Sequence, residues 1–179
     1  MRPLIGSGEV AQAQTTQRTA EEAALAGFHA FMAHDVEALL AAWHPEGIQD
    51  WVPLGIFRGH AEMRELFSGV FASMPDMEMT IEHTVADDRR CVIQWRSRGT
   101  HDGAAFMGIE PTGRTIELRG VDIMEVEDGL IVRNTVYYDG AAFARGLGML
   151  PPQDSGAEKL MLGAFNGVTK LRRAIAERT

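Results

Sequence analysis

One acidic residue, Asp122, occupies a position where an apolar residue is expected. It lies in residues 114–127, where apolar and polar residues alternate as in a strand with one buried face. Leu118 and Met124 share its side, so we expect apolar side chains to enclose the carboxyl group. Burial disfavours the charged form of a carboxyl group and displaces its pKa, which suits it to acid–base catalysis. The alternative is a structural carboxylate that only accepts hydrogen bonds from its neighbours.

An imidazole is the expected partner of this carboxylate. Residues 91–101 also alternate, and their inward side ends at His101. Residues 108–114 contain a proline and a glycine that favour a turn, so we expect the two strands to pair antiparallel about it. That pairing places His101 beside Gly120 and close to Asp122, where it could protonate a carbonyl oxygen or orient the carboxylate. The alternative is a histidine that faces solvent at the mouth of a cavity.

Two further side chains could take part in proton transfer. Asp50 precedes Trp51 in a short strand or loop, and in apolar surroundings it could remove a proton next to a carbonyl group. The alternative for Asp50 is a loop aspartate that caps a turn, which is the more common role. His83 has the parity of an inward residue in the alternating segment 77–90, but we expect it at the rim of the site.

Aromatic, methionine and valine side chains at inward positions predict an apolar cavity. Such a cavity suits a flat or alicyclic ligand whose orientation is fixed by a few polar groups. For any single one of these residues, a place in a filled hydrophobic core is the alternative. The expected ligand-binding residues are Trp51, Trp95, Phe106, Met107, Met124, Val136 and Tyr138.

The elements that must position these residues begin with helices and end with strands. Thr19 and Glu22 form a capping-box pattern that predicts the start of a first helix. Asp35 and Gly59 precede two further helical patterns. Consecutive antiparallel strands follow, with a tight turn at Asp128-Gly129. This order predicts an α+β fold, a cone-shaped barrel in which a curved antiparallel sheet packs on three N-terminal helices.

Length and composition limit the remaining possibilities. The 179 residues divide into a flexible arm over residues 1–17, one domain over residues 18–150 and a C-terminal helical extension over residues 151–179. The net charge of −8 argues against nucleic acid or an anionic membrane as a partner. Cys91 is the only cysteine, so a cytoplasmic setting is expected. The six histidines lack metal-ligand spacing and no phosphate-binding glycine loop is present, so neither a metal nor a cofactor is expected.

Several short motifs recur in a characteristic order between residues 20 and 150. They are Phe57-Arg58-Gly59-His60, Phe71 through Pro75-Asp76, Arg98-Gly99-Thr100-His101, Pro111-Thr112-Gly113-Arg114, Gly120-Val121-Asp122, Asp128-Gly129-Leu130-Ile131 and Leu147-Gly148. No single motif is specific, but their order and spacing resemble the SnoaL-like polyketide cyclases, a family with the nuclear transport factor two-like fold. The resemblance implies a cone-shaped domain, whereas members of that superfamily include several kinds of enzyme and proteins without any chemistry.

The resemblance carries over to the family's site residues only in part. It places Val136 at the acid/base aspartate of the cyclases and Asp122 at their histidine. Ketosteroid isomerases of this fold use two aspartates, which Asp50 and Asp122 match, and a tyrosine on the first helix, which is absent here. The Arg-Asp-Asp constellation of the epoxide hydrolases is also missing, because its matching positions are Gly99, His101 and Val136.

The predicted function is therefore cofactor-independent acid–base catalysis, an aldol cyclisation or an isomerisation. The substrate would be a small, hydrophobic, enolisable molecule such as a polyketide or steroid-like ketone, and the catalytic residues would be Asp122, His101 and Asp50. The alternative is a protein that binds a hydrophobic ligand or acts as a dimeric scaffold, which the missing cyclase aspartate favours. The outward Val121 and Ile123 leave an apolar stripe on the convex face of the sheet, which predicts a homodimer through that face.

Overall fold

The computed structural model describes residues 18–177, so the predicted arm over residues 1–17 lies outside the described residues. Its helices are α1 (Ala20–Met32), α2 (Val36–Ala41), α3 (Gly59–Ser73), α4 (Gly140–Leu147) and α5 (Gly156–Ala176). Its strands are β1 (Trp43–Trp51), β2 (Gly55–Arg58), β3 (Glu78–Ala86), β4 (Arg90–His101), β5 (Arg114–Glu127) and β6 (Leu130–Tyr138). None of the helices in this described range is long and apolar enough to cross a membrane.

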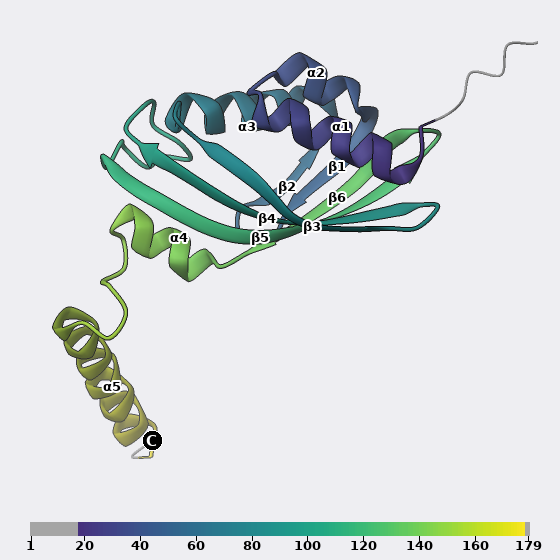
Figure 1. The fold of residues 1–179 in the computed structure, drawn as a ribbon. Coiled ribbons are helices and arrows are strands. Elements are labelled where there is room, and N and C mark those ends of the chain that lie inside the picture. The colour runs from purple at the N-terminus through teal and green to yellow at the C-terminus, as the bar shows by residue number, and fades with distance from the viewer. Residues whose placement is uncertain (1–17, 178–179) are drawn as a thin grey trace, which may run out of the picture.

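The strands form one curved sheet in the order β2-β1-β6-β5-β4-β3. Helices α1, α2 and α3 cover its concave face, which confirms the predicted α+β cone (Figure 1). The sheet stays open, with β2 and β3 as its edges. The prediction of a purely antiparallel sheet is wrong in one place, because β1 enters the sheet beside the last strand and runs parallel to β6.

The helices start where the capping residues predict. The side chain of Thr19 accepts a hydrogen bond from the Glu22 amide while the Glu22 carboxylate accepts one from the Thr19 amide, so the capping box is complete. Asp35 caps α2 in the same way through the amide of Ala38. Buried alanines and Phe28 on α1 then allow that helix to pack closely over the sheet.

The pairing of β4 with β5 differs from the prediction by six residues. Ile93, rather than Gly99, faces Asp122, and His101 faces Arg114 instead of Gly120. The chain reverses further upstream than predicted, between two residues with positive φ, Met107 (49°) and Gly108 (79°). A shift by an even number of residues leaves every side chain on its predicted face, so both Asp122 and His101 are still buried.

A register shift in β3 turns His83 away from the inward face that its parity in the sequence indicates. The pairing of β3 with β4 slips between Ile81 and His83, and His83 is exposed as a result. The turn from β5 to β6 forms as predicted, with Asp128 and Gly129 both at positive φ (51° and 75°).

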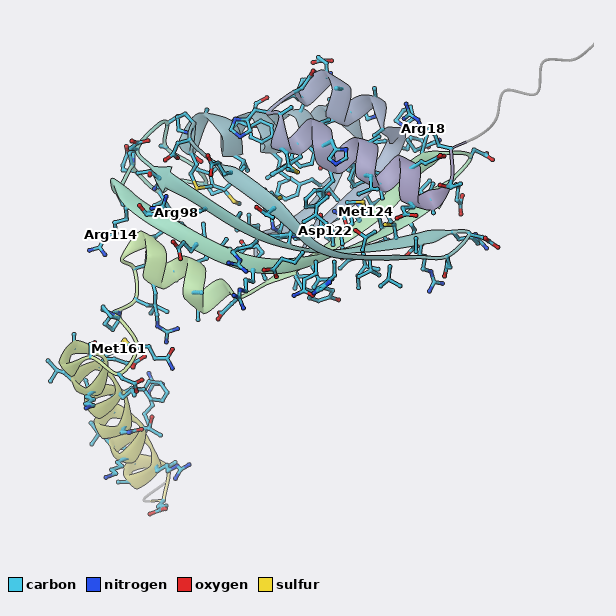
Figure 2. The ribbon with its side chains drawn as sticks, viewed as in Figure 1. Arg18, Arg98, Arg114, Asp122, Met124 and Met161 are labelled. Atoms are coloured by element: carbon cyan, nitrogen blue, oxygen red, sulfur yellow. The ribbon has the colours of Figure 1, made fainter. Side chains whose placement is uncertain are left out.

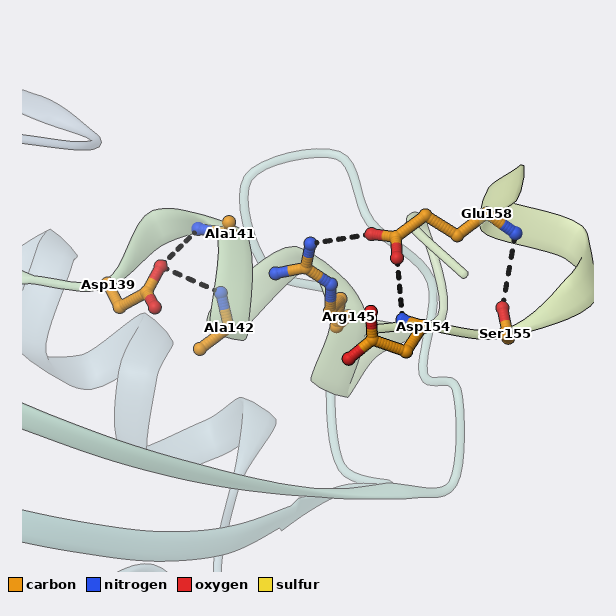
Figure 3. Close-up of polar contacts among 7 residues, drawn as sticks. All are labelled: Asp139, Ala141, Ala142, Arg145, Asp154, Ser155 and Glu158. Carbon is orange, nitrogen blue, oxygen red and sulfur yellow. Dashed lines mark hydrogen bonds and ion pairs between the residues drawn. The ribbon is translucent and has the colours of Figure 1, made fainter. Parts of the chain in front are cut away.

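The chain leaves the sheet through α4 and ends in α5. Figure 3 shows the polar contacts that define this junction. The Asp139 carboxylate caps α4, and the Arg145 guanidinium donates to the Glu158 carboxylate at 3.0 Å. The Ser155 hydroxyl caps α5 by accepting from the Glu158 amide, whereas the Glu158 side chain accepts from the Asp154 amide rather than from that of Ser155, so α5 starts without a complete capping box. In Figure 1, α5 extends away from the domain.

On the convex face of the sheet, Ile123 is exposed and Val121 is half-buried, as their outward parity predicts. A homodimer through this face stays a prediction.

Candidate active site

An apolar cavity lies between the helices and the concave face of the sheet. Its volume is about 90 Å³, several times the ~10–15 Å³ that a single water molecule needs. Residues from α1, α2, α3 and α4 and from all strands of the sheet except β2 line it. Asp122 and Met124 on β5 lie between the sheet and the covering helices, as Figure 2 shows. The cavity is therefore built by the whole domain and holds the carboxyl group that the alternation in β5 predicts to face inward.

Two side chains hold the Asp122 carboxylate in place. The Trp95 indole Nε1 donates a hydrogen bond to its Oδ1 at 3.1 Å, and the Asn134 amide Nδ2 donates one to its Oδ2 at 3.2 Å. Each oxygen therefore has one donor, which suits the ionised form of the carboxyl group. Trp95 and Asn134 lie on the two strands that flank Asp122, so the sheet itself fixes the geometry.

Burial raises the pKa of Asp122 to about 6. The largest cause is desolvation, because only 8% of the residue is exposed and its surroundings are mostly apolar. The hydrogen bonds from Trp95 and Asn134 act in the opposite direction and keep the pKa from rising further. A carboxyl group with a pKa close to neutrality can both accept and return a proton under physiological conditions.

A glycine makes room for the tryptophan that contacts Asp122. Gly120 pairs directly with Trp95 across β5 and β4, and a Cβ atom added at Gly120 would overlap the indole ring. The ring can lie over the strand only because that position lacks a side chain. Gly120 thus allows the indole Nε1 to reach Asp122, two residues further along β5.

Two buried amides complete the polar side of the cavity, and neither is a predicted site residue. The Asn134 Nδ2 also donates to the Gln49 Oε1 at 3.3 Å, so Gln49, Asn134 and Asp122 form a buried chain of hydrogen bonds. Asn134 shares the inward parity of Val136 and Tyr138, which is the signal that could have identified it. Gln49 likewise lies two positions from Trp51 and shares its inward face, a signal that is visible only once β1 is recognised as a strand.

Tyr138 brings a hydroxyl group to the same cavity. It pairs with Gly120, so it lies diagonally across from Asp122 on the same face, roughly 7 Å away between β-carbons. Its ring packs edge-on against Trp51, with centroids 6.3 Å apart, and against Phe143, with centroids 5.9 Å apart. Burial raises the pKa of Tyr138 to about 12, so the hydroxyl stays protonated and can donate.

Most of the predicted ligand-binding residues line the cavity, and one does not. Met107 is 53% exposed at the tip of the β4–β5 turn, and its predicted place in the cavity is wrong. The correction follows from the same turn that shifts the strand register, since positive φ at Met107 puts it at the reversal point. The predicted residues that do line the cavity are Trp51, Trp95, Phe106, Met124, Val136 and Tyr138.

His101 is buried, but it does not lie beside Asp122 as predicted. It lies eight positions along β4 from Ile93, the residue that faces Asp122, which corresponds to roughly 27 Å along the strand. It instead lines a separate, small cavity of about 10 Å³ with Phe106 and Phe143. Its Nδ1 lies 3.5 Å from the Thr112 hydroxyl, and its Nε2 is buried without a hydrogen-bond partner.

Asp50 also lies outside the cavity. The alternation of β1 turns Gln49 and Trp51 inward and therefore directs Asp50 to the opposite face, where its carboxylate lies 3.6 Å from the Arg133 guanidinium. The predicted apolar mouth around Asp50 is wrong for this reason. Among residues 18–177, no three His, Cys, Asp or Glu side chains lie close enough together to hold a metal ion.

The comparisons with known proteins agree with this fold. A family model described as a SnoaL-like domain matches residues 24–134, and no curated protein matches the chain. A candidate SnoaL-like polyketide cyclase from Jannaschia sp. CCS1 superposes with a TM-score of 0.66 at 17% identity, covering 78% of this chain and 99% of that chain.

Two Streptomyces structures give similar values. IdmH from Streptomyces antibioticus, a candidate polyketide cyclase, has a TM-score of 0.62 at 24% identity and covers 73% of this chain and 99% of its own. AclR from Streptomyces galilaeus, a candidate hydroxylase, has a TM-score of 0.64 at 22% identity and covers 74% of this chain and 97% of its own. At such identities the solved structures indicate the fold alone.

Proposed function

Because the chain belongs to the SnoaL-like domain family of the nuclear transport factor two-like superfamily, we propose that it is a cofactor-independent acid–base catalyst. Its substrate would be a small hydrophobic ketone that can enolise, such as a polyketide or steroid-like molecule. Its reaction would be an aldol cyclisation or an isomerisation. The observation that carries this proposal is the single carboxyl group in the apolar cavity, Asp122, whose pKa is raised to about 6.

Asp122 acts as the general base. Above its pKa the carboxylate removes a proton from the carbon next to the substrate carbonyl, and the electron pair of that C–H bond moves to the carbonyl oxygen to form an enolate. The surrounding apolar side chains exclude water from the carboxylate, and the donors Trp95 and Asn134 hold it in one orientation. General bases placed in this way contribute about 10²–10⁴-fold to a reaction rate.

The position of Asp122 accounts for the missing cyclase aspartate. The resemblance to the cyclases places that aspartate at Val136, and Asp122 faces Val136 directly across β5 and β6. A carboxyl group on either strand projects into the same part of the cavity, since directly opposed residues share a face. The acid–base group is thus retained on the neighbouring strand.

Tyr138 donates its hydroxyl proton in a hydrogen bond to the enolate oxygen. Its raised pKa keeps it protonated, and its diagonal position leaves room for a substrate carbon near Asp122 and a substrate oxygen near Tyr138. Protonated Asp122 then returns its proton. In an isomerisation the proton goes to a different carbon, and in an aldol cyclisation it goes to the alkoxide formed when the enolate carbon attacks a second carbonyl.

An exchange assay tests the base without knowledge of the natural substrate. We expect the protein to accelerate deuterium incorporation at the α-carbon of a bicyclic ketone such as 2-tetralone in D₂O, followed by proton NMR. Asp122→Asn should reduce the catalysed rate by about 100-fold or more. Glu125→Gln changes an exposed carboxylate on the outer face of the same strand and serves as the matched control, with an unchanged rate expected. Exchange that persists in Asp122→Asn would exclude Asp122 as the base.

A further inference from the structure

Helix α5 has an apolar side that nothing in the described chain covers. None of its 21 residues is buried, although Phe165 (67% exposed), Val168 and Leu171 are large and apolar. Figure 2 shows Met161 on this helix, away from the domain. Helices in water derive most of their stability from packing such a side against a partner. An exposed helix of this length and pattern therefore points to a contact that a single chain does not make.

The spacing of these residues is that of a helix that pairs with another helix. Met161, Val168 and Ile175 recur every seven residues, and Ala164 and Leu171 lie three residues after the first two of them, at the fourth position of each repeat. We call these five residues the α5 seam. The seam is nearly symmetric about Val168, since Met161 and Ile175 each lie seven residues from it. A second copy running antiparallel would thus meet apolar residues along the whole seam.

The charges favour the same arrangement. Both lysines of the chain, Lys159 and Lys170, lie on α5 together with Arg172 and Arg173, against one carboxylate, Glu158. Residues 18–155 carry 11 arginines, no lysine and 22 carboxylates. Three of the four cations lie near the far end of α5, so only an antiparallel neighbour brings that basic end back toward an acidic domain. Antiparallel pairing also places opposite ends of the two helix dipoles together.

We propose that α5 is the dimerisation element of this protein and that two copies pair through their α5 seams, antiparallel, about a twofold axis at Val168. The contact is self-complementary, as a twofold interface requires. The Arg145–Glu158 ion pair and the Ser155 cap fix the start of α5 beside α4. The large seam residues Met161, Val168, Leu171 and Ile175 are 42–62% exposed, so a second copy can reach them. The convex sheet face is a poorer match for a basic helix, because its carboxylates Glu82 and Glu117 are already paired with Arg96 and Arg98.

A charge placed on the seam tests the proposal in the full-length protein. Sedimentation equilibrium should show a dimer for the natural chain. Val168→Glu should raise its dissociation constant by about 100-fold or more, because two carboxylates would face each other without water. Asn166→Glu adds the same charge on the opposite side of the helix and should leave the dimer intact. A natural chain that stays monomeric, or a dimer that Val168→Glu does not weaken, would overturn the proposal.

Cysteine cross-linking tests the direction of pairing. Met161→Cys and Ile175→Cys proteins should each fail to cross-link alone under mild oxidation and should form a disulfide-linked dimer when mixed. The natural Cys91 is fully buried and serves as an internal background. Cross-linking of Met161→Cys to itself would contradict the antiparallel arrangement.

A flotation assay tests whether the α5 seam binds a membrane surface instead of a second copy of the chain. Vesicles of equal parts phosphatidylcholine and phosphatidylserine should not bind the natural protein. Binding that Val168→Glu abolishes would show that the seam faces lipid and would overturn the proposal.

Discussion

The indole Nε1 of Trp95 donates a hydrogen bond to the Oδ1 of Asp122 at 3.1 Å, between two residues 27 positions apart in the chain. The indole is the donor that a buried carboxylate needs, and Gly120 provides the space for its ring. The pKa of Asp122 is thus set by two opposing causes, desolvation that raises it and two donors that lower it. Changing either cause should move the pKa in a known direction.

Replacing Trp95 by phenylalanine should raise the pKa of Asp122, because it removes a donor to the charged form and keeps an aromatic ring. The catalysed exchange of 2-tetralone should increase with pH through about 6 in the natural protein, where Asp122 becomes ionised. In Trp95→Phe the midpoint of this increase should move upward by about one pH unit. A midpoint that stays in place would mean that the indole does not tune the carboxylate.

The free energy of unfolding of Asp122→Asn, relative to that of the natural protein, should be higher at neutral pH than at acidic pH. The raised pKa means that the folded state holds the Asp122 proton more tightly than the unfolded state, whose value is near 3.8. This contribution to stability is fully present below about pH 4 and is lost as the pH rises through about 6. The variant, which cannot ionise there, should therefore gain about 2–3 kcal/mol over the natural protein between these limits.

Urea unfolding of both proteins at about pH 4 and about pH 8 measures this difference. Glu125→Gln, on the exposed face of β5, is the control and should show no comparable change. A stability difference that is independent of pH would contradict a raised pKa at Asp122.

Gly120→Ala should destabilise the protein and disturb the site together. A Cβ atom at residue 120 overlaps the Trp95 ring, which then has to move away from Asp122. Overpacking of this kind costs about 1–3 kcal/mol in unfolding free energy, and the exchange rate should fall as the carboxylate loses a donor. In the Trp95→Leu background the same glycine change should cost less, because the clashing ring is absent, and equal costs in both backgrounds would argue against the contact.

Asp50→Asn should leave the exchange rate close to that of the natural protein. Asp50 lies on the opposite face of β1 from the cavity and contacts Arg133, so its carboxylate has no path to a bound ketone. Steady-state exchange rates with 2-tetralone check this. A loss as large as that of Asp122→Asn would restore Asp50 as a base, as its position in the sequence suggests.

The face on which each strand residue lies could largely be predicted from the sequence. Alternation in β4 and β5 places Asp122, Trp95 and His101 inward, and all three are buried. Alternation gives the face alone, whereas the neighbour across the sheet depends on where the chain turns. Here the turn is at Met107-Gly108, and a methionine at positive φ is too uncommon to be predicted.

That single turn separates His101 from Asp122 and decides the composition of the site. Asn134 takes the place that the sequence assigns to His101, as the side chain that contacts the carboxylate. The bulge at His83 and the parallel pairing of β1 with β6 are likewise results of packing between distant segments. Local patterns therefore predicted the carboxylate and the apolar lining, and tertiary contacts determined the polar partners.

Carbon-13 NMR of protein labelled at the aspartate carboxyl carbons measures the titration of Asp122 directly. Its signal can be assigned by its absence in Asp122→Asn. We expect a titration midpoint near pH 6 in the natural protein and a higher midpoint in Trp95→Phe. A midpoint at or below about pH 4, the range of an exposed aspartate, would contradict the claim that a buried carboxyl group is tuned for proton transfer.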